Sequence, residues 1–589
     1  MVGWTAGADQ GTDTLVFTSV TQGANVADIV TSTTGTAIVV TTTQGSAASA
    51  ATSQSALPSI KNVEVLQLGG ALGNASLDFT NYTKAATGIE QIVLDNVAAL
   101  NGQTVTTTAG QSLSLATGAS NVATAGKVTW AASNTDTSAS LVLNGYQGGT
   151  GVVAQAVDIT GTLTTTLNIA SKGAANAIST LTGPTTVTKH VITGDQNLTY
   201  ALAAADAAKV KTIDASAATG AVKVDTSAGT KDIAFAFTGG KGNDKLTLKA
   251  ADLAQLTAGS QLDGGAGTDT LAIKDTTLAA ADYAKINATK SFEVLGLEAG
   301  ATVDASKLTA IKSFAVNTGT NVISALQTGS TVDILGATTK TTLGGDTGVK
   351  AVTINLGAAT SNGISNTALD ITGLTEVALT SNGKAGAANA VGTLTNSENT
   401  TFTITGSTDL TIALTTGATV SGSSVLASAF TGKLTATGTD QADIIVGGSG
   451  ADTITGGKGN DVLTGNGGAD KFVTTNVTAA GTDWIKDFVA GTDKIYASNN
   501  TTGTTNASAI VDKGALSTST YATLDAAIAS FASAGANATT AKYTYVFTYG
   551  TDTYALIDIA TAGYVAGDDA IVKLTGITGT LAVTDIIIA

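Results

Sequence analysis

The stretch from residue 438 to residue 473 divides without a gap into four segments of nine residues. The second segment reads GGSGADTIT (447–455) and the third reads GGKGNDVLT (456–464). The first, GTDQADIIV, has Thr439 and Gln441 where its neighbours have glycine, and the fourth, GNGGADKFV, keeps the aspartate and the apolar position. Both complete segments match the nonapeptide of parallel β-helices that bind calcium, so this stretch decides the fold.

The spacing of the repeat predicts how its segments stack. Six residues form a turn, where glycine permits unusual backbone angles, and three residues form a short strand with one inward apolar side chain. Two segments complete one coil, so equivalent turns recur every 18 residues. We therefore expect Asp443 to lie over Asp461, and Asp452 over Asp470.

Stacked carboxylates repel each other unless a cation lies between them. Calcium takes about six to eight oxygen ligands, which two aspartates and the backbone carbonyls of both turns can supply. The alternative is a flexible glycine-rich linker, which would not need glycine, aspartate and apolar residue in fixed register. We therefore predict several calcium ions in this stretch.

Two further copies of the nonapeptide stand apart from the tandem stretch. They read GGKGNDKLT (239–247) and GGAGTDTLA (264–272), and their aspartates are 25 residues apart. We interpret the excess over one coil as a helix near residues 248–256 inserted between two stacked turns. A weaker match over residues 7–16 has no visible partner, and a plain turn explains it equally well.

The predicted calcium ligands fall into two sets. In the tandem stretch they are Asp443, Gly447, Ser449, Ala451, Asp452, Gly456, Lys458, Asn460, Asp461 and Asp470. In the separate pair they are Gly239, Lys241, Asn243, Asp244, Gly264, Ala266, Thr268 and Asp269.

The remainder of the chain has short Thr- and Val-rich runs separated by Gly, Asn and Asp, which is typical of an all-β protein. Four segments share one pattern: an apolar residue, then Glu, then apolar residues at alternating positions. Their glutamates are Glu64, Glu90, Glu293 and Glu376. This recurrence favours an elongated parallel β-helix or β-roll solenoid. The Glu side chains should face solvent, with a ligand role as the alternative.

Few helices are expected in this solenoid. The Ala-rich segments 200–210, 248–256 and 521–531 have helical apolar spacing and predict short packing helices. Tyr543 to Phe547 and Tyr554 to Ile557 predict a strand pair joined by a turn.

Composition excludes several classes of function. The 589 residues carry a formal net charge of −16, no Arg and no Cys. The lack of a basic stripe argues against nucleic-acid binding, and acidity by itself would only favour solubility. No apolar run approaches the about 18 residues of a membrane span. The single histidine, His190, cannot supply H-E-x-x-H and is expected to be an exposed side chain.

These repeats resemble the RTX family of bacterial proteins exported by type I secretion. The similarity continues over residues 483–495, which resemble the segment that closes RTX rolls, and over residues 552–576, which resemble the C-terminal secretion region. From the closing segment, Asp487 is added to the predicted metal ligands. A C-terminal secretion signal would also explain why residues 1–4 do not begin a signal peptide.

Within that family the chain is most similar to the calcium-dependent surface-layer proteins of the Caulobacter type, which share its composition and the G-T-D-x-L turn followed by an apolar-Glu strand. The resemblance implies a non-enzymatic structural protein outside the cell, which forms a lattice with itself and contacts a cell-surface polysaccharide or lipopolysaccharide. The N-terminal helical anchor of such proteins is not visible here. A secreted adhesin or matrix protein is the alternative.

The sequence and the resemblance together predict five segments. These are a β-rich N-terminal solenoid (1–235), a first pair of RTX turns with a helical insert (236–275), a β-rich middle segment (276–437), a tandem RTX β-roll (438–500) and a C-terminal module with the type I secretion signal (501–589).

Overall fold

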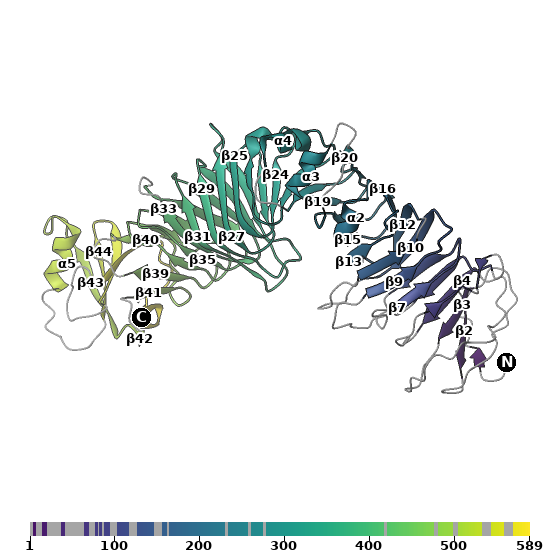
Figure 1. The fold of residues 1–589 in the computed structure, drawn as a ribbon. Coiled ribbons are helices and arrows are strands. Elements are labelled where there is room, and N and C mark those ends of the chain that lie inside the picture. Colours follow the sequence, from purple (N-terminus) through teal and green to yellow (C-terminus); the bar gives the residue numbers. More distant parts are fainter. Residues whose placement is uncertain are drawn as a thin grey trace. The chain divides into compact units, whose positions relative to one another are not determined.

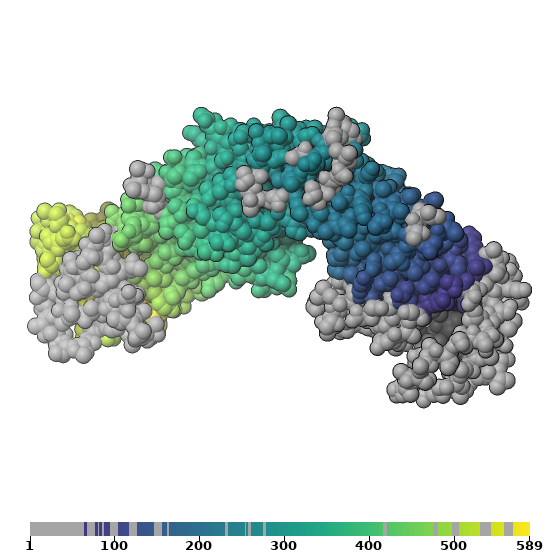
Figure 2. All heavy atoms as spheres, in the orientation of Figure 1, coloured from purple at the N-terminus to yellow at the C-terminus, as the bar shows by residue number. Residues whose placement is uncertain are grey.

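A computed structural model gives the fold of the chain (Figure 1). It describes residues 4–6, 14–19, 37–41, 64–69, 77–80, 82–84, 88–94, 103–116, 127–146, 156–161, 164–229, 234–256, 261–274, 278–416, 421–475, 481–498, 505–532, 543–558 and 569–588. Figure 2 shows in colour the residues whose side chains are described.

The chain divides into two compact units. Unit 1 contains residues 1–274 and 279–295, and unit 2 contains residues 275–278 and 296–589. Each is a parallel β-solenoid, and together they have about 15 turns. The expected all-β solenoid is confirmed, whereas the division into five segments remains a prediction.

From residue 65 onward, successive strands of unit 1 alternate between two sheets. One sheet contains β1 (Trp4–Ala6), β2 (Thr14–Ser19), β3 (Ala37–Thr41), β4 (Val65–Gly69), β6 (Gln91–Leu94), β8 (Ser112–Ala116), β10 (Ser138–Asn144), β12 (Thr166–Lys172), β14 (Lys189–Gly194), β16 (Thr212–Ala218), β18 (Ala236–Thr238) and β20 (Gln261–Asp263). The other contains β5 (Leu77–Asp78), β7 (Gln103–Thr106), β9 (Lys127–Ala131), β11 (Ala156–Thr160), β13 (Asn176–Thr182), β15 (Leu198–Leu202), β17 (Val222–Asp225), β19 (Lys245–Leu248) and β21 (Thr270–Ile273). Strand β22 (Val294–Leu297) contains the boundary between the units.

Unit 2 repeats this alternation. One sheet contains β24 (Ser313–Val316), β26 (Thr331–Ile334), β28 (Ala351–Leu356), β30 (Glu376–Ser381), β32 (Thr401–Gly406), β34 (Ser424–Phe430), β36 (Ile444–Val446), β38 (Val462–Thr464) and β40 (Asp483–Ile485). The other contains β23 (Thr302–Asp304), β25 (Gly319–Leu326), β27 (Thr338–Gly345), β29 (Ser365–Thr372), β31 (Ala388–Asn396), β33 (Asp409–Thr416), β35 (Leu434–Thr437), β37 (Thr453–Thr455), β39 (Lys471–Thr475), β41 (Lys494–Ser498), β47 (Ile586–Ile588) and β42 (Thr505–Asn506).

The end of unit 2 departs from the parallel pattern. Strands β43 (Ala509–Leu516), β44 (Tyr543–Tyr549), β45 (Asp552–Ile557) and β46 (Ala570–Leu574) form its C-terminal part. Strands β44 and β45 pair antiparallel across a turn at Gly550, as expected from the Tyr-rich sequence. Strand β46 pairs with both β45 and β40, so the C-terminal part joins the last coils of the solenoid.

Alternation along each strand builds the core between the sheets. In β12, Leu167 and Ile169 are buried while their neighbours are partly exposed, as a period of two requires. Glu64, Glu90, Glu293 and Glu376 are exposed, which confirms the predicted solvent face. Residues 62 and 63 of the first such segment lie outside the described residues.

Helices are short, and one prediction about them is wrong. Helices α3 (Ala250–Gln255) and α5 (Leu524–Ala532) occur where expected, and α4 (Ala280–Asn287) was not predicted. Of the predicted helix 200–210 only α2 (Ala204–Ala207) forms. In the described part of the chain, short 3₁₀ turns cover Ala305–Lys307 and Val583–Asp585. Among the described residues, no helix combines the length and apolar character needed to cross a membrane.

The same region corrects the prediction for His190. Tyr200 lies in β15, paired with β13 and β17, and is buried, because the parallel ladder outweighs the helical preference of the following alanines. His190 is only 2% exposed, and its Nδ1 lies 3.2 Å from the Tyr200 hydroxyl. The histidine is therefore a core residue rather than an exposed one.

Candidate metal centre

The four tandem segments stack as the 18-residue spacing predicts. Strand β36 pairs with β38 and β37 pairs with β39, each in parallel with a shift of one coil. The inward residues Ile445, Leu463, Ile454 and Phe472 are fully buried. Burial of each such side chain contributes about 1.5–3 kcal/mol, which fixes the turns between the strands.

This stacking arranges the aspartates in two columns. In the first column, the Asp443 amide donates to Oδ1 of Asp461 at 2.8 Å, and the Asp461 amide donates to Oδ1 of Asp483 at 3.3 Å. In the second column, the Asp452 amide donates to Oδ1 of Asp470 at 2.9 Å, and the Asp470 amide donates to Oδ1 of Asp493 at 3.0 Å. All six side chains are buried. The predicted pairs are thus confirmed, and each column has a third member.

The turns differ in the hydrogen bonding of Oδ2, the second carboxylate oxygen of each aspartate. Oδ2 of Asp443 accepts the Thr439 amide at 2.5 Å, and Oδ2 of Asp452 accepts the Gly448 amide at 2.6 Å. By contrast, Oδ2 of Asp461 and Oδ2 of Asp470 are buried without a hydrogen-bond partner. A buried carboxylate oxygen without a donor is costly, so each column has an oxygen that a cation would satisfy.

The raised pKa values of aspartates in the columns also favour a bound cation. Burial, reinforced by the charges of Asp452, Asp493 and Asp487, raises the pKa of Asp470 to about 7. Burial and the neighbouring carboxylates of Asp483 and Asp443 also raise the pKa of Asp461. A divalent cation between the turns would offset both the desolvation and the repulsion.

Glycine at the first position of each segment leaves the space that a cation needs. A side chain at Gly456 would collide with Oδ2 of Asp461, and one at Gly465 would collide with Oδ2 of Asp470. A side chain at Gly438 would collide with the carbonyl oxygen of Gly456 in the stacked turn. Carboxylate and carbonyl oxygens therefore surround a space that holds no side chain.

These residues fit calcium if the backbone supplies most of the ligands. Within the described part of the chain, no three Asp, Glu, His or Cys side chains form a cluster suited to a metal ion. Calcium accepts carbonyl oxygens as readily as carboxylates. The carboxylates of Asp443, Asp461, Asp452 and Asp470 would hold the ions together with carbonyls of the turns.

The other predicted ligands of the tandem stretch lie in these turns. Gly447, Ser449 and Ala451 precede Asp452, and Gly456, Lys458 and Asn460 precede Asp461. The Asn460 side chain accepts the Thr482 amide at 2.7 Å, and the Lys458 side chain pairs with Asp440. Their carbonyl oxygens remain predicted ligands.

The closing segment gives Asp487 a different environment. Its oxygens accept the amides of Gly465 at 2.9 Å and Asn466 at 2.7 Å, which closes the last nonapeptide turn. Its role as a metal ligand remains a prediction. Sequence reasoning missed Asp483 and Asp493 as column members, because they follow Asp461 and Asp470 by 22 and 23 residues rather than 18.

The separate pair of nonapeptides lies in unit 1 and also stacks. Strands β19 and β21 pair with Lys245 opposite Thr270, and helix α3 lies in the connection between their coils, as predicted. The predicted residues Gly239, Lys241, Asn243 and Asp244 form one turn, and Gly264, Ala266, Thr268 and Asp269 form the next. Of the weak match over residues 7–16, only the start of β2 is described, and Asp9, Gly11 and Asp13 lie outside the described residues.

The two columns of the tandem stretch should bind calcium as separate groups. In the full chain, Asp461→Ala is expected to remove the calcium bound by the first column and Asp470→Ala that bound by the second. The double variant should lose the ions of both columns, because the effects of substitutions at separate sites are nearly additive. Isothermal titration calorimetry gives the number of ions for each variant.

The matched control is Asp440→Ala. Asp440 is an exposed carboxylate in the same repeat and pairs with Lys458, so this variant should bind as many ions as the wild type. Equal losses at both columns from Asp461→Ala alone, or no loss at all, would contradict the stacked-column arrangement.

Comparison with known families identifies the tandem stretch. The family model of the RTX calcium-binding nonapeptide repeat matches residues 437–472 in four copies. No curated protein matches the sequence. The tandem stretch is therefore a calcium-binding RTX repeat region within a parallel β-solenoid.

Proposed function

We propose that this protein is a calcium-dependent structural protein that assembles with copies of itself into a two-dimensional layer on a bacterial cell surface. The observation that supports this most is the pair of buried aspartate columns set into the solenoid. Calcium in these columns would stiffen a body of stacked strands, whose repeated faces suit identical contacts between subunits.

The charge of the chain gives calcium a second role in this proposal. A net charge of −16 opposes close packing of like subunits. Calcium that bridges acidic surfaces of neighbouring subunits would reduce that repulsion. Assembly should therefore require more calcium than folding of the subunit.

We also propose that the protein is not an enzyme. The chain has no cysteine, and its single histidine is buried against Tyr200. Nucleophilic chemistry that needs a Cys–His or Ser–His pair would thus have no accessible base. RTX repeats are typical of secreted proteins, and we propose export by type I secretion with attachment to a surface polysaccharide or lipopolysaccharide.

Assembly is tested by adding calcium to the purified chain. Light scattering should rise, and negative-stain microscopy should show ordered sheets, whereas the same ionic strength of sodium chloride should give neither. Folded, calcium-loaded protein that stays monomeric at high concentration would contradict the layer. A secreted adhesin or matrix protein would then be the better explanation.

A further inference from the structure

We propose that asparagine side chains do in the middle part of unit 2, residues 301–396, what calcium does in the tandem RTX region. The middle part then folds without calcium and is the template on which the tandem region folds when calcium binds. It lies outside residues 437–472, which match the repeat family. The proposal rests on calcium binding by the tandem repeats and is independent of surface-layer assembly.

One end of the Asn389 side chain acts as an aspartate does in a tandem turn. The Ile364 amide donates to Oδ1 of Asn389 at 2.8 Å, just as the Ser423 amide donates to Oδ1 of Asp443 at 2.6 Å. Each donor directly precedes a strand, β29 or β34. Each acceptor lies at the start of the next strand in the same sheet, β31 or β36. The two side chains therefore join stacked coils in the same way.

The other end of the Asn389 side chain is a donor, as no carboxylate oxygen can be. Its Nδ2 lies 3.1 Å from the Leu356 carbonyl oxygen and 2.9 Å from the Asn382 carbonyl oxygen, and it donates to the Ser381 hydroxyl at 2.9 Å. Leu356 ends β28, and Asn382 directly follows β30, the next strand in that sheet. The partly positive amide group thus lies between carbonyl oxygens of two coils, where a tandem turn would hold a cation.

Aspartate cannot complete a turn in this way. An ionised carboxylate has no hydrogen to donate. Accordingly, Oδ2 of Asp461 and Oδ2 of Asp470 are buried without a partner, whereas both ends of the buried Asn389 side chain are hydrogen-bonded. A turn built on aspartate needs a cation among its oxygens, but a turn built on asparagine is neutral and complete without one.

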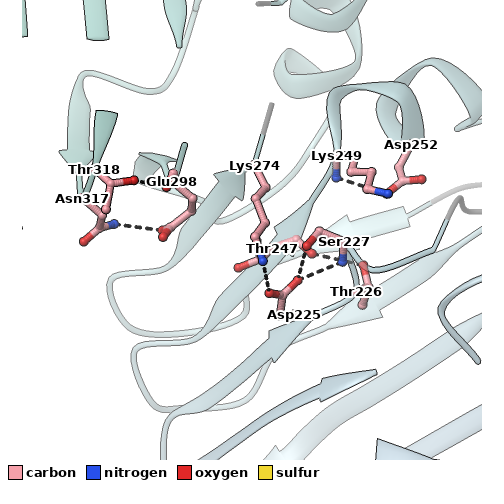
Figure 3. A network of polar contacts seen from close by, with 10 residues as sticks. All are labelled: Asp225, Thr226, Ser227, Thr247, Lys249, Asp252, Lys274, Glu298, Asn317 and Thr318. Atoms are coloured by element: carbon pink, nitrogen blue, oxygen red, sulfur yellow. Dashed lines mark hydrogen bonds and ion pairs between the residues drawn. The ribbon is translucent and has the colours of Figure 1, made fainter. Parts of the chain in front are cut away.

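The turn at Asn321, three coils before Asn389, repeats the arrangement. The Ala301 amide donates to Oδ1 of Asn321 at 3.1 Å, and Nδ2 donates to the Thr318 carbonyl oxygen at 3.0 Å. Next to it, Nδ2 of Asn317 donates to Oε1 of Glu298 at 2.9 Å, and the Thr318 hydroxyl donates to the Glu298 carbonyl oxygen at 2.6 Å (Figure 3). The carboxylate beside this turn thus also has an amide donor in place of a cation.

The strands of the middle part are long enough to pack without calcium. Strands β27, β29 and β31 have 8, 8 and 9 residues, whereas β36, β37 and β38 have 3 each. A long strand such as β29 buries Leu369 and Ile371, but β38 buries only Leu463. Stability of a solenoid is roughly the sum of its repeats and their interfaces. Strands β36 and β37 stack on β34 and β35, so calcium adds the tandem coils to coils that are already stable.

Hydrogen exchange of the full chain, in a chelator and in millimolar calcium, tests the calcium independence. Removal of calcium should speed amide exchange in peptides covering 447–472 by about 100-fold or more, and in peptides covering 319–396 by less than about threefold. Loss of protection in both regions would overturn the proposal, because the middle part would then need calcium. The measurement is made on the monomer, so a failure of the surface layer would leave it unaffected.

Asn389→Asp tests the role of the amide, since it replaces Nδ2 by an oxygen of similar size. Oδ1 still accepts the Ile364 amide, but the new oxygen faces the carbonyl oxygens that Nδ2 contacts. Exchange in 364–396 in the chelator should become about tenfold faster or more. The matched control is Asn399→Asp, at an exposed asparagine whose Oδ1 accepts the Ser421 amide at 3.0 Å. This control should exchange as the wild type does.

The same two variants test the template. The calcium concentration that half-protects 447–472 should rise about fivefold or more in Asn389→Asp, because the tandem coils then stack on weaker neighbours, and should not change in Asn399→Asp. Wild-type protection of 364–396 in Asn389→Asp, or an unchanged calcium requirement of 447–472 despite a weakened middle part, would overturn the proposal. If Asn389→Asp does not fold at all, the comparison of the wild type in chelator and in calcium decides.

Discussion

The thermal unfolding of the chain is expected to move to much lower temperature when calcium is removed. A site that is saturated about 1,000-fold over its dissociation constant adds about 4 kcal/mol to the free energy of unfolding. In unit 2, of about 300 residues, each such site shifts the melting temperature by roughly 6 °C. Since each tandem column has a buried carboxylate oxygen without a partner, the effect should exceed that of a single site.

The cause is the unfavourable state of the columns without a cation. Asp443, Asp461, Asp452 and Asp470 are all at most 2% exposed, and burial raises the pKa of each. In the unfolded chain these carboxylates are hydrated and charged at neutral pH without penalty. Calcium binds only where folding has brought the turns together, so its binding free energy adds directly to folding stability.

Circular dichroism melts in a chelator and in millimolar calcium measure this shift. Magnesium at the same concentration is the control, since it gives up its water reluctantly and requires octahedral geometry. It should restore little of the stability. Superimposable melting curves in chelator and calcium would show that the columns are stable without the ion.

The core of the metal centre could be predicted from the sequence because each position of the nonapeptide has one physical function. The apolar residue fixes the inward side, so Ile454 and Phe472 align residue by residue. Glycine at the first position leaves room for the carboxylate, as Gly456 does for Asp461. Once those positions are fixed, the stacking of the aspartates follows from the length of one coil.

The ends of the columns could not be predicted in this way. Asp483 and Asp493 follow loops longer than the nonapeptide turn, so counting from the repeat does not reach them. Glu293 is the exposed Glu of an apolar-Glu segment that looks like three others in the chain. Pairing of β21 with β22, which begins one residue after Glu293, brings the Glu293 carboxylate within 2.7 Å of the Asp269 amide nitrogen.

Local helix propensity was also misleading where pairing with neighbouring parallel strands determines the structure. The Ala-rich segment 200–210 has helical spacing, yet Tyr200 lies opposite Val224 in a parallel pair. His190 pairs with Leu167 and Ile213, both inward-facing, which puts it in the core. A polar residue becomes buried at such a position when a partner such as the Tyr200 hydroxyl is present.

The substitution Gly457→Ala is expected to destabilise the tandem region strongly. Gly457 has a φ of +109°, which a residue with a side chain rarely adopts. A side chain there would also collide with the carbonyl oxygen of Thr439 in the stacked turn. Strain and overpacking together should lower the free energy of unfolding by about 3 kcal/mol or more.

Gly457→Ala should also weaken calcium binding. The added side chain would push on Thr439, whose amide and hydroxyl donate hydrogen bonds to Oδ2 of Asp443. Gly491→Ala is the matched control: its φ is +82°, but nothing lies within 4 Å of the added carbon. That variant should show the strain alone, about 1–2 kcal/mol, with unchanged calcium affinity. Denaturant unfolding and calcium titration of both variants separate the two effects. Equal destabilisation with equal calcium affinity would mean that the close approach of the stacked turns does not determine the site.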